Sequence, residues 1–211
     1  MLNSCKHVNG GFSWHDRTEW LVPVNHNRRP IRQHGDGKKD LGEIFNLLNK
    51  KLIHKRTCIQ AGGNIGIWPI RFSKIFDLVV TFEPEAINYE CLKHNTGDIA
   101  NIAANNYALS KFASVDLLQR EDNNCESFYA VPGDSIKSIR IDDCGFKNVD
   151  LIYLDIEGSE LDALIGAEET IKRDSPLIGV EIVFSEPMEY LESLGYEIIT
   201  VIGNDVIMGN K

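Results

Sequence analysis

Short apolar runs alternate with amphipathic stretches from Arg56 to the end of the chain. The apolar runs predict strands at 57–61, 78–83, 99–104, 150–156, 176–184, 196–202 and 205–209. Between them, apolar residues three to four apart predict helices at 66–76, 85–95, 134–143, 159–173 and 186–194. Because this alternation is typical of βαβ units, we expect an α/β fold with a mostly parallel sheet.

Both ends of the chain depart from the alternation. At the C-terminus, YEIITVIGNDVIMG has two strands around a Gly-Asn-Asp turn and no helix, which predicts an antiparallel hairpin at a sheet edge. Residues 1–39 show no sustained period and predict an exposed loop, followed by an amphipathic helix at 40–52. We therefore divide the chain into an N-terminal arm and helix, 1–55, and a main domain, 56–211.

Charge is spread unevenly over the 211 residues, whose formal net charge is −9. Residues 1–56 hold 11 of the 22 Lys and Arg residues but only five acidic ones. The acidic remainder argues against binding duplex nucleic acid, because phosphate contacts need basic side chains gathered on one face. The basic arm either packs on the acidic body or covers the site of an anionic acceptor.

The spacing of the cysteines and the length of the apolar segments indicate the cellular compartment of the protein. The five cysteines are scattered without a CxxC pair, which indicates reduced thiols and no zinc cluster. The N-terminus lacks a signal-peptide pattern, and no run reaches the roughly 18 apolar residues of a membrane span. We expect a cytoplasmic protein without a membrane segment; its oligomeric state stays open.

The stretch CIQAGGNIGIWPIRF forms the first predicted turn from strand to helix. In a parallel sheet this turn commonly holds a ligand, and glycines at 62, 63 and 66 let the backbone approach one closely. A turn required for packing alone would have the same glycines, so both interpretations remain.

An acidic residue ends the next predicted strand. Glu83 follows Gly66 by 17 residues, near the roughly 20-residue interval at which an acid reaches a ribose hydroxyl. The GxGxxG frame of dinucleotide sites fails, because Asn64 and Ile67 stand where glycines belong. The pattern favours a nucleoside over NAD, which makes an NAD-dependent oxidoreductase the weaker alternative.

A second acidic group, DIEGSE, follows the strand predicted at 150–156. On an extended strand, Asp155 and Glu157 would point the same way and face the cleft. Ser159, with Asp162 three residues later, predicts a cap for the next helix. The alternative for the two acids is a solvated strand end.

Six blocks together resemble the FkbM family of S-adenosylmethionine-dependent methyltransferases over about residues 56–202. They are IQAGGNIGIWPIRF, VVTFEPEAINYECLKHN, NNYALS, DSIKSIRIDDCG, VDLIYLDIEGSELDALIGAEETI and PLIGVEI. The resemblance implies a Rossmann-like class I sheet of seven strands whose final strand is reversed. It also implies S-adenosylmethionine as cofactor, with Asp155 and Glu157 beside the transferred methyl group.

The resemblance implies the cofactor contacts residue by residue. The methionine part would lie against the turn, Glu83 would bind the ribose hydroxyls, and a segment at 108–110 would border the adenine. The implied cofactor-binding residues are Gln60, Gly62, Gly63, Asn64, Gly66, Glu83, Ala108, Leu109, Ser110 and Asp155. Two residues depart from the family pattern: Gln60 replaces the usual Asp, and Tyr153 replaces the usual Lys.

The expected reaction is O-methylation of a hydroxyl on a sugar or natural product. It needs a base near the acceptor oxygen, and Asp155 or Glu157 is the candidate. Alternative bases are His15, His26 and His34, and the basic arm residues Arg28, Arg29, Arg32, Lys38 and Lys39 would favour an anionic acceptor. No metal-ligand spacing stands out. A catalytically silent module that binds a cofactor or partner is the alternative function.

Overall fold

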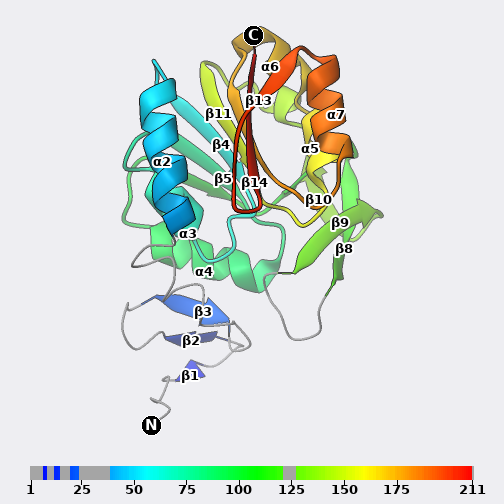
Figure 1. The fold of residues 1–211 in the computed structure, drawn as a ribbon. Helices are drawn as coiled ribbons and strands as arrows, with labels where there is room; N and C mark the ends of the chain where they lie inside the picture. The colour runs from blue at the N-terminus through cyan, green and yellow to red at the C-terminus, as the bar shows by residue number, and fades with distance from the viewer. Residues whose placement is uncertain (1–6, 9–11, 15–19, 24–38, 121–126, 211) are drawn as a thin grey trace.

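A seven-stranded sheet forms the centre of the molecule, with helices on both faces (Figure 1). The computed structural model describes residues 7–8, 12–14, 20–23, 39–120 and 127–210. The strand order is β13-β14-β12-β11-β4-β5-β6. Their bounds are β4 Thr57–Ala61, β5 Leu78–Phe82, β6 Ile102–Asn105, β11 Val149–Leu154, β12 Leu177–Glu181, β13 Tyr196–Ile202 and β14 Asp205–Asn210.

Only β14 runs against its neighbours; the other pairings in this sheet are parallel. This confirms the α/β fold class and the reversed final strand. The predicted hairpin is present. Its second strand, β14, lies between β12 and β13, so β13 is the strand at this edge of the sheet and β6 is the strand at the other edge. All seven predicted strands exist, with ends shifted by up to three residues.

The helices pack in two layers. α2 (Lys39–Lys51) and α3 (Ile67–Phe72) cover one face, and α4 (Ala86–Thr96) contacts β6 on the outer side of the sheet. α5 (Glu160–Ile165), α6 (Glu168–Asp174) and α7 (Glu186–Ser193) cover the other face. The single helix predicted at 159–173 is therefore two helices, interrupted at Gly166 and Ala167.

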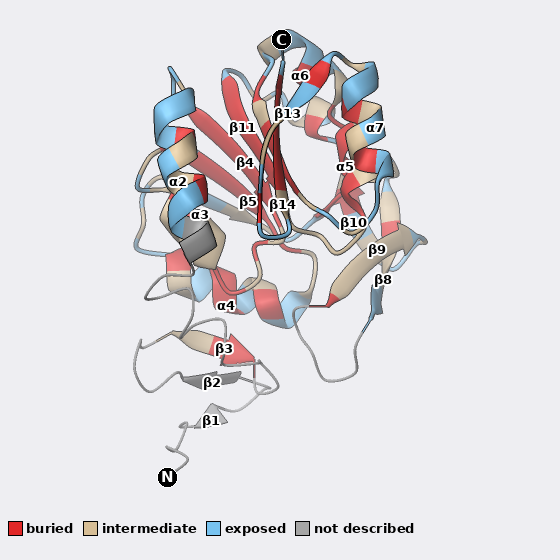
Figure 2. Ribbon diagram, in the orientation of Figure 1, coloured by how far each residue is buried: buried red, intermediate tan, exposed pale blue. Residues whose placement is uncertain are grey.

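The core consists of one apolar cluster on each face of the sheet, and Figure 2 shows the central strands buried. Side chains alternate along β11, so that Leu151 and Tyr153 pack toward α2 and α3, while Ile152 and Leu154 pack toward α5–α7. Burial on both faces explains why these strands are continuous apolar runs in the sequence.

A second sheet lies beside the main one, in the order β7-β10-β8-β9. Its strands are β7 Ala108–Leu109, β8 Ser114–Gln119, β9 Phe128–Pro132 and β10 Ile136–Ile139, and a 3-10 turn, η1, spans Ile141–Cys144. The helix predicted at 134–143 is thus wrong. β10 pairs with both β7 and β8, and these backbone hydrogen bonds outweigh a local spacing that also fits a helix.

The N-terminal arm contains a small antiparallel sheet where a loop was predicted, formed by β1 His7–Val8, β2 Phe12–Trp14 and β3 Leu21–Pro23. Val22 is fully buried against Ile65 and Cys91. The Asn95 side chain binds the backbone of Leu21 and also donates to Ile65 O at 2.8 Å. Strand β3 therefore supports the glycine turn from outside the sheet.

Several predicted features lie outside the described residues, namely His15, His26, His34, Arg28, Arg29, Arg32 and Lys38. Among the described cysteines, Cys58, Cys91 and Cys144 are free thiols. None of the helices in the described part combines the length and apolar character needed to cross a bilayer.

Candidate active site

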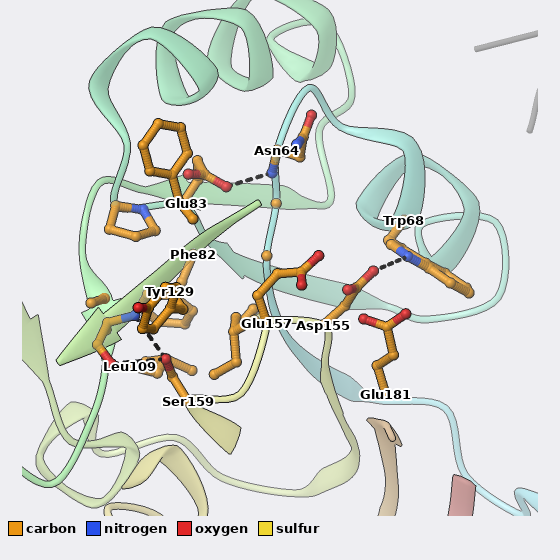
Figure 3. Close-up of a pocket in the computed structure, with 18 of the residues that line it drawn as sticks. Asn64, Trp68, Phe82, Glu83, Leu109, Tyr129, Asp155, Glu157, Ser159 and Glu181 are labelled. Carbon is orange, nitrogen blue, oxygen red and sulfur yellow. Dashed lines mark hydrogen bonds between the residues drawn. The ribbon is translucent and has the colours of Figure 1, made fainter. Parts of the chain in front are cut away.

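A cavity of about 420 Å³ opens where β4, β5, β11 and β12 end (Figure 3). This is the edge at which open parallel sheets bind ligands, and the volume suits a small molecule. Of the predicted site residues, those that line it are Gly62, Gly63, Asn64, Glu83, Ala108, Leu109, Asp155 and Glu157. The structure thus brings the turn, the strand-end acid and the DIEGSE group around one space.

The glycine turn is held by backbone contacts. The amides of Gly62 and Gly63 both donate to Phe82 O, at 3.1 and 2.9 Å. Gly62 has φ +81, and a Cβ there would lie 1.8 Å from Asp155 O. Glycine at 62 is therefore required by the close approach of the segment after β11, and the same lack of a side chain leaves its backbone facing the cavity.

Glu83 is bound directly to the turn. Its Oε2 accepts from Asn64 N at 2.7 Å and its Oε1 from Glu85 N at 2.9 Å. The residue is only 5% exposed, and this burial raises the pKa of the Glu83 carboxyl to about 7, although the two amides act in the opposite direction. The acid and the turn form one unit, as Figure 3 shows.

Three predicted cofactor residues do not line the cavity: Gln60, Gly66 and Ser110. The buried Gln60 amide donates to Ala61 O and Gly62 O, at 2.8 and 3.0 Å. A Cβ on Gly66 would face α4, 3.2 Å from Thr96. Gln60 and Gly66 therefore support the turn from the side facing away from the cavity: Gln60 by hydrogen bonds to its backbone, and Gly66 by allowing it to pack closely against α4.

Asp155 stands at the opposite wall of the cavity. Its Oδ2 accepts from Trp68 Nε1 at 3.0 Å, and its carboxyl is hydrogen-bonded to that of Glu181. Loss of hydration, followed by the charge of Glu181 and the hydrogen bond to it, raises the pKa of Asp155 well above its usual range. The Asp155 carboxyl therefore holds its proton more tightly than an ordinary carboxyl does.

Glu157 lies beside Asp155 and Glu181, but its backbone conformation differs from the extended strand predicted from the sequence. β11 ends at Leu154, and Glu157 has φ +58, so the expected strand spacing of Asp155 and Glu157 is wrong. Both side chains still line the cavity, and one oxygen from each of Asp155, Glu157 and Glu181 lies within 4.8 Å of the others. Such a group is close enough to surround a cation.

The turn that carries Glu157 is tied to the second sheet. Ser159 was expected to cap α5, but its side chain makes no capping bond; instead its Oγ accepts from Ala130 N at 2.8 Å. Arg120 Nη2 donates to Glu157 O at 2.7 Å. Ala130 and its neighbour Tyr129 lie on β9 and line the cavity, so Ser159 links the turn after β11 to the cavity wall. The capping prediction, which considered only nearby residues, missed this long-range contact.

Sequence reasoning missed other lining residues, chiefly Trp68, Tyr129, Glu181, Asn204 and Asp205. Glu181 ends β12, but the predicted strand continued to Phe184, so the strand-end argument applied to Asp155 did not reach Glu181. Tyr129 lies on a strand that the pattern did not predict. Among the described lining residues there are five carboxyl side chains and no Lys, Arg or His.

The model of the FkbM methyltransferase domain matches residues 60–199. An FkbM methyltransferase from Methylobacillus flagellatus has 20% identity and a TM-score of 0.49, over 72% of this chain and 43% of its own. This chain therefore spans less than half of that relative. The search of curated proteins found no match.

Two further solved structures resemble the chain over most of their length. A precorrin-6y C5,15-methyltransferase from Geobacter metallireducens has 14% identity and a TM-score of 0.51, over 79% of this chain and 86% of its own. A TehB-like SAM-dependent methyltransferase from Corynebacterium glutamicum has 16% identity and a TM-score of 0.50, over 87% and 93%. At such identities the likeness shows the shared fold.

Proposed function

Because the chain belongs to the FkbM methyltransferase family, we propose that it uses S-adenosylmethionine (SAM) to methylate a hydroxyl oxygen. The observation that carries this proposal is the single cavity joining the turn and Glu83 at one end to Asp155 and Glu157 at the other. One bound molecule can therefore contact a nucleoside-type site and a group of carboxyls at the same time.

The residues present fit this cofactor. Backbone at Gly62 and Gly63 faces the cavity without side chains, so that the methionine part can lie against it. Each Glu83 carboxylate oxygen has two lone pairs, so the oxygens that accept from Asn64 and Glu85 can also accept from ribose hydroxyls. Ala108 and Leu109 provide an apolar wall for the adenine.

Bound SAM would supply a methyl group on a positively charged sulfur. The protein's part is to hold the acceptor oxygen in line and to take its proton. We assign the proton to a carboxylate oxygen of Asp155, because its raised pKa makes its ionised form a stronger base than an ordinary carboxylate. Glu157, beside them, would accept a hydrogen bond from the acceptor.

The charge of the described cavity lining favours a neutral acceptor rich in hydroxyls. Carboxylates accept hydrogen bonds from hydroxyl groups but repel phosphate, and the described lining has no basic side chain to offset them. A sugar or a natural product with free hydroxyls would suit this lining.

Calorimetric titration with S-adenosylhomocysteine tests the cofactor site. Glu83→Ala should weaken binding by roughly tenfold to a hundredfold, the range for a hydrogen bond to a charged group. Glu85→Ala is the matched control: Glu85 caps α4 through Asn88 N at 2.7 Å and does not line the cavity, so affinity should be unchanged. Equal affinities in wild type and Glu83→Ala would contradict the ribose assignment.

A second measurement separates enzyme from silent module. Methyl-labelled SAM offered with a panel of sugars and polyhydroxylated natural products should give labelled product that wild type forms and Asp155→Asn does not. Binding without any turnover would favour a cofactor-binding module, and binding of NAD in preference would point to an oxidoreductase.

A further inference from the structure

Tyr153 crosses a neighbouring strand to reach the cavity wall. In the sheet register Tyr153 on β11 lies beside Gly179 on β12, which in turn lies beside Ile207 on β14. A Cβ on Gly179 would lie only 2.4 Å from Tyr153 Cδ2. Because residue 179 is glycine, the tyrosine ring passes over β12, and its hydroxyl donates to Asp205 Oδ1 on β14 at 2.5 Å.

The ring is held rigidly in this position. Tyr153 is fully buried, and its centroid lies 4.5 Å from that of Trp68 and 5.2 Å from that of Phe72. Burial first, and then the charge of Asp205, raises the pKa of the Tyr153 phenol well above its ordinary value. The hydroxyl is therefore protonated at neutral pH and donates to Asp205.

Register places Asp205 in a row with the two acids already described. Asp155 lies two residues beyond Tyr153, Glu181 two beyond Gly179, and Asp205 two before Ile207 on the reversed strand. Because strand side chains alternate, all three point to the same face, and Glu181 and Asp205 are direct partners. All three line the cavity.

We propose that Asp205 is an acceptor-binding residue and that Tyr153 is the residue that positions it. Asp205 would accept a hydrogen bond from a hydroxyl or ammonium hydrogen next to the transferred methyl. This inference rests on the proposed function. It assigns a role in substrate binding to the C-terminal hairpin, whose residues Gly203 and Asn204 also line the cavity.

A pair of cofactor analogues tests this without a known acceptor. S-adenosylhomocysteine lacks any group in place of the methyl, whereas in sinefungin a carbon replaces the sulfur and the ammonium group on that carbon takes the place of the methyl. Asp205→Asn, which keeps the side-chain size, should weaken sinefungin about tenfold more than S-adenosylhomocysteine, as expected for loss of a charged hydrogen-bond partner. Tyr153→Phe, which keeps the ring, should change the same ratio by several-fold in the same direction.

Tyr196→Phe is the matched control. It removes another buried tyrosine hydroxyl, which donates to Pro176 O at 3.0 Å on the α7 side and does not line the cavity. Its ratio of the two affinities should equal that of wild type. Circular dichroism and a thermal melt establish that each variant folds, and Asp205→Asn tests the binding role even if Tyr153→Phe melts early.

The outcomes separate the two proposals. An unchanged ratio in Asp205→Asn, with S-adenosylhomocysteine still bound, overturns this inference and leaves the proposed function standing. A Tyr153→Phe variant that loses both analogues equally shows a purely structural tyrosine and overturns its positioning role. Failure of wild type to bind either analogue overturns both proposals.

Discussion

The two ends of the cavity handle buried acids in different ways. At the turn end, Glu83 is satisfied by backbone amides from its own neighbourhood, Asn64 N and Glu85 N. At the opposite end, Asp155 is satisfied by side chains that come from other elements, Trp68 on α3 and Glu181 on β12. The first arrangement uses backbone groups, one of them 19 residues away on the glycine turn, whereas the second needs α3 and the ends of β11 and β12 to lie together.

This difference bears on what each end can do. Backbone amides cannot change their protonation, so at the turn end only Glu83 itself titrates, and the amides present a fixed pattern to a cofactor that is the same in every cycle. A carboxyl with a raised pKa, such as that of Asp155, can accept a proton more readily than an ordinary one, which suits the end where an acceptor must lose a proton.

Gly62→Ala should disrupt both ends, because they touch at this residue. The new Cβ would lie 1.8 Å from Asp155 O at φ +81, and left-handed strain of about 1–2 kcal/mol plus overpacking of about 1–3 kcal/mol should cost about 3 kcal/mol or more in unfolding free energy. Gly145→Ala has φ +67 but open space around the Cβ, so it should show the strain alone. Equal urea midpoints for the two variants would contradict the close approach.

Val22→Ala should weaken the turn end from outside the sheet. Val22 is fully buried against Ile65, and loss of two methyl groups should cost about 2 kcal/mol of stability. Val201→Ala, at a position 52% exposed, is the control and should cost little. If Val22→Ala melts at the wild-type temperature, β3 does not support the turn.

Affinity for S-adenosylhomocysteine should fall as pH drops through about 7, the pKa to which burial raises Glu83. Ribose hydroxyls donate to the ionised carboxylate, so affinity at pH 6 should be roughly tenfold below that at pH 8. Glu83→Gln should remove this dependence. A pH dependence that survives in Glu83→Gln would assign it to another group.

The same pKa has the opposite effect on the free protein. Since the folded pKa is raised, the stability that this carboxyl contributes is fully present below its unfolded value and is lost as pH rises through about 7. The unfolding free energy of wild type should therefore fall relative to that of Glu83→Gln as the pH rises from 5 to 8.

Ser159→Ala should have the smallest effect of the four changes. It removes the bond from Ala130 N at 2.8 Å and should cost about 1 kcal/mol, with β9 loosened in hydrogen exchange. Ser185→Ala removes only an exposed bond to Glu189 and should cost less than about 0.5 kcal/mol. Loss of helix content without loss of protection in β9 would restore the capping interpretation.

The predictable parts of the molecule were those whose pattern follows from burial. β4 has the predicted ends, and it is buried along its whole length, as expected for a strand covered on both faces, which forms a near-continuous apolar run in the sequence. The second sheet could not be predicted in this way. Its short strands, such as β10 at Ile136–Ile139, are half-exposed and gain their stability from pairing with β7 and β8.

The same division holds in the site. The glycine turn, Glu83 and Asp155 could be located from the sequence, because the carboxyl ends of successive parallel strands meet at one edge of a sheet. The contacts of Asp155 with Glu181 and of Tyr153 with Asp205 could not be located in this way, because they follow from how the strands pack side by side. These contacts join residues 26 and 52 positions apart. They depend on the strand register and on the space that the missing side chain of Gly179 leaves for the Tyr153 ring. Neither the register nor this space produces a periodic pattern in the sequence.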